Sequence, residues 1–419
     1  MEDVRAQAEA TARRSYGRLL AILSARSGDV ASAEDALASA FEAALRTWPV
    51  GGVPQQPEAW LLTVARRAWI DVVRSNQSHA ALLDEMALLS EEGYIDADAR
   101  AIPDRRLALM FACAHPAIDA AVRAPLILQT ILGFDAATIA SAFLVSPAAM
   151  AQKLVRAKKK IRDSRIPFEI PDQSAIPARL ASVLDAIYST YTDSWFDPAG
   201  ADLHRRNLAE EAISLAQLLC QLAPSEPEVF GLLALMLYAE SRRATRRNAQ
   251  GDYVPLAAQD AALWNKPLLR MAEQALRHAA NLRRVGRYQL EAAIQSAHMT
   301  RVDNRLTDWQ AVVFLYEQLM QLDDGALADS PVVRINYAIA LAETTGPQAA
   351  LAQLCALEHD ERVRQYQPWW AARAHLFAAV GEVAQADAAY DMAIGLETDV
   401  AVRHFLQGQR ALLARRDAK

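Results

Sequence analysis

Glycine and proline are scarce in this chain, with 15 Gly and 18 Pro among 419 residues. The sequence also lacks the alternation of β-branched and polar residues that is typical of strands. Alanine and leucine, both strong helix formers, are abundant instead. The composition therefore predicts an all-α protein, and a prior of about 150 residues per domain predicts two or three domains.

Long apolar runs and paired cysteines are missing as well. No run of about 18 or more apolar residues is present, which argues against a membrane span. The N-terminal residues are charged and lack an apolar core, so we expect no secretory signal. The three cysteines, Cys113, Cys220 and Cys355, are far apart in sequence and form no paired motif, which favours a reducing cytoplasm.

Motifs for catalysis are also missing. Cys113 lies near His115, but no second pair of ligands follows, so we expect both residues in a core rather than at a metal. We recognise no nucleophile–base pair, metal cluster or glycine-rich phosphate loop. The sequence therefore predicts no enzymatic activity and no cofactor.

Charge is distributed unevenly along the chain. The net charge is −6, from 44 Lys+Arg and 50 Asp+Glu. Residues 1–166 hold 20 Lys+Arg and 19 Asp+Glu. Residues 167–419 therefore hold 24 Lys+Arg (44 − 20) and 31 Asp+Glu (50 − 19). Residues 152–165 alone carry seven cations against one acid. A mostly acidic chain with one cationic helix is expected to bind DNA weakly unless something else holds it there.

Residues 133–162 predict two helices joined by a tight turn. Asp135 is suited to cap a helix from Ala136 to Leu144. Ser146 is suited to cap a second helix, with Pro147 at its first position. Only Val145 separates the two, so the spacing indicates a helix-turn-helix.

The second of these helices has two different faces. Met150, Leu154 and Ile161 form an apolar stripe at helical spacing. Cations are expected to crowd the remaining surface: Lys153, Arg156, Lys158, Lys159, Lys160 and Arg162. Such a helix suits a nucleic-acid groove.

Residues 10–76 predict a compact helical domain. Ser32 is expected to open a helix that buries Ala33, Leu37, Ala40, Phe41 and Leu45. Glu34, Asp35 and Glu42 are expected to face outward. The segment 49–57 is rich in proline, so we expect a projecting loop rather than a helix.

A further helix is expected from Glu58 to Arg74. Its inward residues would be Trp60, Leu61, Val64 and Ile70. Arg66, Arg67 and Arg74 would be exposed, either as a solvated face or as a binding face.

Residues 77–102 are acidic, with six Asp+Glu and Arg100 as their only Lys or Arg. They predict either a flexible linker or an acidic segment that lies in a basic channel of a partner. Residues 103–165 then form a second helical domain that ends in the helix-turn-helix.

Several segments of this sequence resemble bacterial sigma factors of the extracytoplasmic-function type. AEDALASAF resembles the helix that contacts the polymerase clamp. WPVGGVPQQPEAWLLTVARRAWIDVVR resembles the loop and helix that recognise the −10 element. DRRLALMFACAHP, followed by FLVSPAAMAQKLVRAKKKIR, resembles the domain that reads the −35 element.

The resemblance implies partners and roles for particular residues. The partners would be core RNA polymerase, through its β and β′ subunits, and promoter DNA, with polymerase holding two weak DNA contacts together. The linker 77–102 would lie in the RNA-exit path. Polymerase contacts would fall to Glu34, Asp35 and Phe41.

The DNA contacts implied by the resemblance fall into two groups. The −10 group is Pro54, Gln55, Gln56, Trp60, Arg66, Arg67 and Arg74. The −35 group is Ser146, Ala148, Ala149, Ala151, Gln152, Lys153, Arg156 and Lys160. In the second group Gln and Ala suit base edges and thymine methyls, while the cations suit phosphates. The chain departs from the family at Ala38 and Ser39, where a Gln-Glu pair is usual, and at Trp69, where a polar residue is usual.

Residues 172–419 lie outside a minimal sigma factor and predict tetratricopeptide-like helical repeats. GEVAQADAAYDMAIGLET matches the second half of such a repeat, and Gly346 precedes its Gly381 by 35 residues. The segment also resembles the extension of one sigma-factor subgroup, through PSEPEVFGLLALML, GRYQLEAAIQSAH and SPVVRINYAIALAET. We expect it to regulate activity or to bind a protein or small-molecule partner.

Three further features of the sequence allow more than one interpretation or need their own prediction. The cluster Arg242, Arg243, Arg246 and Arg247 suits an acidic partner, but a solvated helix end is favoured. NAQGDYVPLAAQDAALWN is expected to form a long ordered loop. For the whole chain, the alternatives to a sigma factor are a helix-turn-helix regulator that acts without polymerase and a repeat scaffold with vestigial sigma domains.

Overall fold

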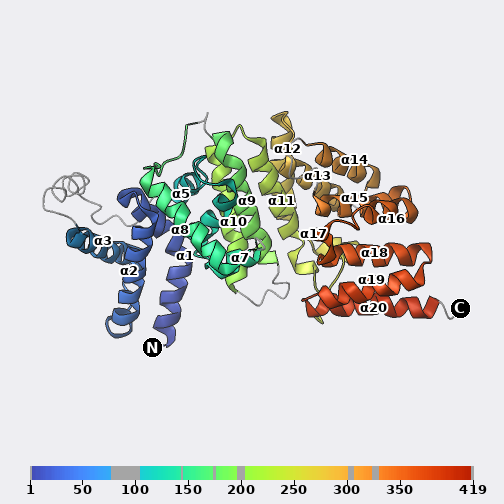
Figure 1. The fold of residues 1–419 in the computed structure, drawn as a ribbon, viewed down its shortest axis with the longest axis horizontal. Helices are drawn as coiled ribbons and strands as arrows, with labels where there is room; N and C mark the ends of the chain where they lie inside the picture. The colour runs from blue at the N-terminus through green and yellow to red at the C-terminus, as the bar shows by residue number, and fades with distance from the viewer. Residues whose placement is uncertain are drawn as a thin grey trace. The chain divides into compact units, whose positions relative to one another are not determined.

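The computed structural model describes residues 2–76, 104–142, 145–172, 176–195, 203–300, 306–322 and 330–416. These residues form helices, turns and one isolated β-bridge between Arg247 and Tyr253, with no strand among them (Figure 1). The prediction of an all-α fold is confirmed. The chain divides into two compact units, Met1–Thr190 and Tyr191–Lys419.

The first unit contains both regions that the sequence predicts as sigma-type domains. Its helices are α1 (Glu2–Ser27), α2 (Val30–Gly51), α3 (Pro57–Asn76), α5 (Arg106–Cys113), α6 (Ala120–Leu132), α7 (Ala136–Ala142), α8 (Pro147–Asp163) and the greater part of α9 (Ile176–Trp195). The boundary with the second unit therefore falls inside α9, whereas the sequence suggests one near residue 172. The acidic segment 77–102 lies outside the described residues.

Close packing of α1 on α6 joins the two predicted sigma-type regions. Gly17 of α1 lies against the backbone of Ile131, and a Cβ atom at Gly17 would stand 2.1 Å from the Ile131 carbonyl oxygen. Gly133 caps α6 with a φ of 69° and lies beside the ring of Tyr16. Only a residue without a side chain at position 17 allows this approach.

The expected start and end of α2 are wrong, and Leu45, predicted to be buried on this helix, is 49% exposed. Asp29, not Ser32, caps this helix, because its carboxylate accepts the backbone N–H of Ala31 at 3.0 Å. The helix also continues through Pro49 to Gly51, so the connection to α3 is shorter than the segment 49–57. The buried Trp48 holds this last turn in place, and its carbonyl accepts the N–H of Gly52 at 2.9 Å.

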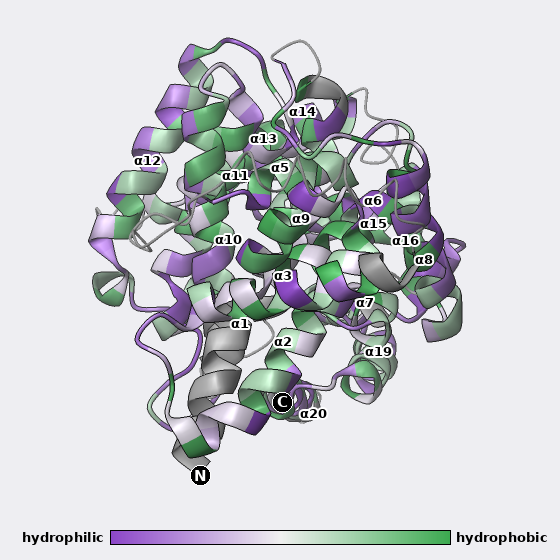
Figure 2. Cartoon of the chain, turned by 90° about the vertical axis from the view of Figure 1, so that its left-hand side faces the viewer, coloured by the Kyte–Doolittle hydropathy of each residue, from purple (hydrophilic) through white to green (hydrophobic). Residues whose placement is uncertain are grey.

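The second unit is a series of packed helices. They are α10 (Leu203–Leu222), α11 (Pro227–Ser241), α12 (Lys266–Asn281), α13 (Arg287–Met299), α14 (Trp309–Gln321), α15 (Pro331–Thr344), α16 (Pro347–Cys355), α17 (Glu361–Arg364), α18 (Gln367–Val380), α19 (Val383–Leu396) and α20 (Val400–Arg416). Short 3₁₀ turns, η2 (Arg243–Thr245), η3 (Leu256–Ala258) and η4 (Ala261–Leu263), lie between α11 and α12. α11 is apolar over most of its length, as the hydropathy colouring of Figure 2 shows, because neighbouring helices cover it.

The crossing of α11 and α13 is unusually close. A Cβ atom at Gly231 would stand 2.5 Å from the backbone nitrogen of Gln289. Glu228 reaches across and accepts the N–H groups of Tyr288 (2.8 Å) and Gln289 (3.0 Å) at the start of α13. Burial raises the pKa of Glu228, and these two hydrogen bonds oppose that rise. A carboxylate at the positive end of a helix dipole is favourable.

The segment 242–264 is ordered, as the sequence predicts, but its arginines are not a solvated helix end. The Arg243 and Arg247 side chains are 17% and 12% exposed. Arg243 pairs with Glu240 at 2.8 Å, and Arg247 pairs with Asp399 just before α20. The expectation of solvation is wrong because these guanidinium groups find carboxylates on neighbouring elements, one of them 152 residues away.

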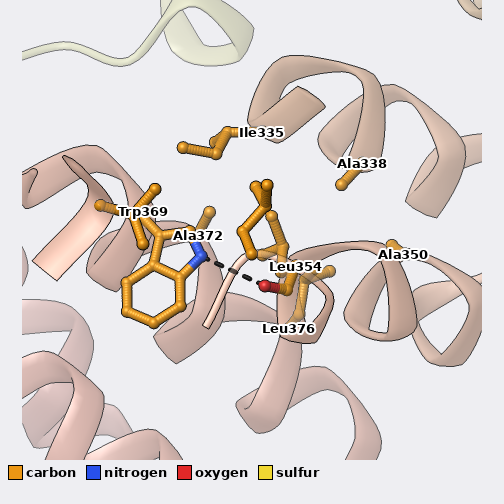
Figure 3. Close-up of a cluster of buried hydrophobic side chains, with 9 residues drawn as sticks. Ile335, Ala338, Ala350, Leu354, Trp369, Ala372 and Leu376 are labelled. Atoms are coloured by element: carbon orange, nitrogen blue, oxygen red, sulfur yellow. Dashed lines mark hydrogen bonds between the residues drawn. The ribbon is translucent and has the colours of Figure 1, made fainter. Parts of the chain in front are cut away.

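Helix pairs with tight turns make up the end of the chain. Gly346, between α15 and α16, has a φ of 102°, and Gly381, between α18 and α19, has a φ of 86°. Both turns need this left-handed backbone, which glycine adopts readily. Trp369 of α18 anchors the core between the pairs, where its indole Nε1 donates to the Leu354 carbonyl at 3.3 Å (Figure 3).

Candidate nucleic-acid interface

Helix α8 is the second helix of the predicted helix-turn-helix, and the structure confirms its start. Ser146 is the N-cap, accepting the Ala149 N–H at 3.3 Å, and Pro147 is the first helical residue. In the preceding helix α7, Asp135 accepts the Thr138 N–H at 2.7 Å, which lowers the pKa of Asp135. α7 and α8 pack against each other, and the Val145 N–H donates to the Ala140 carbonyl at 3.0 Å in the turn between them.

The predicted apolar stripe of α8 is buried. Met150, Leu154 and Ile161 are each 2% exposed or less, and Ala157 joins them. Ala148, Gln152, Arg156, Lys159 and Lys160 are exposed, and Ala149, Ala151 and Lys153 are partly exposed. One face of α8 therefore presents small and amide side chains near its start and cations further along, as a groove-binding helix requires.

Lys158 does not belong to that exposed face, so the prediction of a surface cation is wrong here. The Lys158 residue is 8% exposed, and its Nζ lies 2.8 Å from Oε1 of Glu34 on α2. Glu34 was likewise expected to face outward, yet its side chain is 21% exposed in this pair. Burial raises the pKa of Glu34, while the Lys158 ammonium opposes the rise.

A second ion pair joins the same two helices. Arg162, near the end of α8, has its Nη1 3.6 Å from Oδ2 of Asp29, the N-cap of α2. The Asp29 side chain is 12% exposed, whereas Arg162 is 49% exposed. The basic end of α8 thus rests against the start of α2, and α8 also packs on α6.

The predicted −10 residues lie on α3 and on the loop before it. Gln55 and Gln56 are exposed, Pro54 is partly exposed, and the Gln56 carbonyl accepts the Trp60 N–H at 3.2 Å. Trp60 packs edge-on against Trp48, with ring centroids 5.5 Å apart. The Trp60 residue remains partly exposed.

Farther along α3, the three arginines differ in exposure. Arg67 is exposed, while Arg66 is partly buried. The side chain of Arg74 lies outside the described residues. α1 holds the start of α3 through a hydrogen bond from Ser15 to Glu58 and an ion pair between Arg18 and Glu58 at 3.6 Å.

The predicted polymerase residues on α2 do not form one exposed group. Asp35 is exposed and Phe41 is partly exposed, but Glu34 is occupied by Lys158. Ala38 and Ser39, where the sequence differs from the usual Gln-Glu pair, are both exposed. The Ser39 hydroxyl donates to the Asp35 carbonyl at 3.0 Å. The exposed surface of α2 therefore combines the small residues Ala38 and Ser39 with the charged residues Asp35, Glu42 and Arg46.

Cys113 lies in the core, as the sequence predicts, whereas His115 is partly exposed, so the expectation of a core position is wrong for His115. Cys113 is fully buried with its Sγ 3.6 Å from Thr130 Oγ1, and the His115 ring accepts the Ala117 N–H at 3.1 Å. Within the described ranges, no three His, Cys, Asp or Glu side chains gather as metal ligands would. Likewise, none of the described helices has the length and apolar character that crossing a membrane demands.

Comparison with known families agrees with this geometry. Residues 11–79, which span α1 to α3, match sigma-70 region 2. The chain thus carries a sigma-70 region 2 at its N-terminus, which relates it to the sigma factors that bind RNA polymerase in transcription initiation. Residues 179–280 match a family of unknown function (DUF6596).

A curated relative is similar to this chain over most of its length. An uncharacterized protein of Rhizobium meliloti (strain 1021) is 37% identical over 391 residues, which is 91% of this chain and 90% of that protein. The chain belongs to the same family as this rhizobial protein. No solved structure matches the chain.

Sequence reasoning missed the contact between α2 and α8. Lys158 and Glu34 are 124 residues apart, and a cation in a cationic run carries no local sign of a buried partner. The cap at Asp29 was detectable, because an Asp after a Ser-Gly pair and before an apolar run is a typical N-cap.

Proposed function

We propose that this protein is a sigma factor that binds core RNA polymerase and directs promoter-specific initiation through −10 and −35 elements. The observation that carries the proposal is that one compact unit holds both a sigma-70 region 2 and a helix-turn-helix with a cationic, exposed face. The second unit would regulate this activity or bind a partner. The protein would act in the cytoplasm and would catalyse no reaction of its own.

The −35 contact is assigned to the exposed face of α8. Ala148, Ala149, Ala151 and Gln152 would meet base edges, while Lys153, Arg156 and Lys160 would meet phosphates. Lys158 is not part of this face, because it is paired with Glu34. The −10 contact is assigned to the 54–56 loop and to Trp60, Arg66, Arg67 and Arg74.

Transcription with purified core polymerase tests the proposal. The double variant Lys153→Glu with Arg156→Glu should abolish promoter-specific transcripts and leave binding to core polymerase intact. The matched control is Arg270→Glu with Arg364→Glu, which makes the same charge change at two exposed residues of the second unit. The control should retain most of the activity, since phosphate contacts act over short range.

Three outcomes would contradict the proposal. The first is that no transcript appears from any genomic template although the protein is folded. The second is that the isolated protein binds one DNA sequence tightly at moderate salt without polymerase, which would favour a regulator of the simpler helix-turn-helix kind. Failure to associate with core polymerase at all would favour a repeat scaffold with vestigial sigma domains.

A further inference from the structure

The second unit contains a large cavity, whereas both predicted DNA contacts belong to the first unit. Its volume is about 1090 Å³. Its walls come from the segment 256–262, the start of α12, the end of α13, and one face each of α14 and α15. All of these residues belong to the same compact unit.

Two neighbouring helices supply one wall of the cavity. α14 contributes Trp309, Val312 and Tyr316, and these positions follow one another along a single helix face. α15 contributes Asn336, Ile339, Ala340 and Glu343 in the same way. Val312 and Ala340 are buried in a shared hydrophobic cluster, so they fix the two helices beneath the cavity.

The facing wall is held by its own hydrogen bonds. Gln259, which is 3% exposed, accepts from the Thr245 hydroxyl and donates to the Val254 carbonyl, both at 3.1 Å. Trp264 Nε1 donates to the same Thr245 hydroxyl at 3.1 Å. Asp260 between them accepts the Ala262 N–H at 2.9 Å. This wall is therefore preformed, which lowers the entropy lost when a ligand binds.

Apolar surface inside the cavity is uncovered. Ile339 is 42% exposed and Leu306 is 94% exposed, although both line the cavity. Trp309 adds an aromatic face and packs edge-on against His298 at 5.2 Å. Exposed aliphatic and aromatic side chains at a concave site indicate a ligand with apolar groups.

Charged and amide groups flank this apolar middle. Along α15, Asn336 and Glu343 are seven residues apart, which is roughly 10 Å of helix. Among the described residues of the lining, the charged side chains are the carboxylates Asp260 and Glu343 and the ammonium of Lys266. Residues 167–419 as a whole hold 31 Asp+Glu against 24 Lys+Arg, so long-range attraction also favours a cationic partner.

We propose that this cavity binds an extended, basic peptide segment of a partner protein. Asn336 would pair with the peptide backbone, since its amide offers both a donor and an acceptor. An aliphatic side chain of the peptide would cover Ile339 and Leu306, and a Lys or Arg side chain would approach Glu343 and Asp260. About three to four extended residues span the distance from Asn336 to Glu343, at roughly 3.3 Å per residue.

The inference goes beyond the transcription role and does not depend on it. Its test needs neither polymerase nor DNA. A phage-displayed library of random octapeptides is selected on the full-length chain, and the enriched peptide is then synthesised with a fluorescein label. Its affinity is measured by fluorescence anisotropy for the unmodified chain and for Glu343→Lys, Asn336→Ala and Ile339→Asp.

The enriched peptides should combine Lys or Arg with an aliphatic residue. Each of the three substitutions should weaken binding about tenfold or more, while Glu382→Lys, on an exposed residue before α19, should leave it unchanged. Glu343 and Ile339 are exposed, so circular dichroism should show these variants folded. The proposal is overturned if no peptide is enriched, if acidic peptides are enriched, or if the three variants bind the enriched peptide as tightly as the unmodified chain does.

Discussion

At the scale of single residues, Gly231 determines how closely α11 can approach α13. Replacing it with alanine places a Cβ atom 2.5 Å from the Gln289 nitrogen, and that atom belongs to the backbone, which cannot rotate away. We expect Gly231→Ala to destabilise the second unit by about 1–3 kcal/mol, as overpacking of a core does. Hydrogen exchange of α11 and α13 peptides in the full chain would measure the loss.

Gly408 in α20 supplies the matched control for that change. A Cβ atom at Gly408 meets nothing within 4 Å. Gly408→Ala should therefore stabilise its helix by roughly 0.5–1 kcal/mol through backbone entropy alone. Equal effects of the two substitutions on hydrogen exchange would contradict the close approach at Gly231.

The cysteines offer a second prediction at this scale. Burial raises the pKa of Cys113 and of Cys220 to about 12, whereas Cys355 is partly exposed. Because the thiolate is the reactive form, a raised pKa leaves almost none of it at pH 8. We expect an aromatic disulfide reagent at pH 8 to modify one thiol quickly and the other two only after unfolding. Rapid reaction of all three thiols would show that the regions around Cys113 and Cys220 open to solvent in the folded protein.

The caps of α7 and α8 could be predicted from sequence because they are local. Asp135, Ser146 and Pro147 act within three residues of themselves, and the structure confirms each. The environment of Lys158 could not be predicted, because its partner Glu34 is brought near only by packing of α8 on α2. The same reason explains the expectation of solvated arginines at 242–247, where Asp399 is the distant partner of Arg247.

At the scale of elements, we expect the contact between α2 and α8 to contribute to the stability of the first unit. Replacing Lys158 with alanine would leave the half-buried Glu34 carboxylate without its cation. We expect Lys158→Ala to cost roughly 1–3 kcal/mol in the contact, which is typical of an unsatisfied buried partner. Hydrogen exchange in α2 and α8 should rise accordingly.

Lys159→Ala is the control for this contact, because Lys159 is the next residue of α8 and is exposed. Its exchange pattern should match that of the unmodified chain. The charge-swapped double variant Glu34→Lys with Lys158→Glu should restore part of the protection of α2 and α8 against hydrogen exchange. Similar exchange in Lys158→Ala and Lys159→Ala would show that the ion pair contributes nothing.

The same contact bears on the proposed polymerase site. Glu34 can contact polymerase only when Lys158 releases it, so the pair competes with that interaction. We therefore expect Lys158→Ala to bind core polymerase more tightly, by up to about tenfold for 1.4 kcal/mol of competing energy. Titration of labelled core polymerase would measure the change. Weaker binding would mean that the contact supports the site instead of occupying it.

At the scale of the whole molecule, the family boundaries and the structural boundary do not coincide. The DUF6596 match begins at residue 179, inside α9, while the two units divide at Thr190. Arg179, which is 9% exposed, donates to the Phe111 carbonyl of α5 at 3.2 Å. The first part of α9 is thus tied to the helices of the first unit, so a chain cut before α9 removes part of their packing.

This predicts how two truncated chains should differ. A chain that ends at Trp195 keeps the hydrogen bond from Arg179 to the Phe111 carbonyl and the buried side chains of Ile176, Leu180 and Val183. One that ends at Asp172 loses both that hydrogen bond and that apolar packing, which we expect to cost several kcal/mol. The longer chain should melt cooperatively at the higher temperature. It should also bind core polymerase, because the proposed contacts on α2, α3 and α8 all lie in the first unit. Loss of polymerase binding by a folded 1–195 chain would assign a polymerase contact to the second unit.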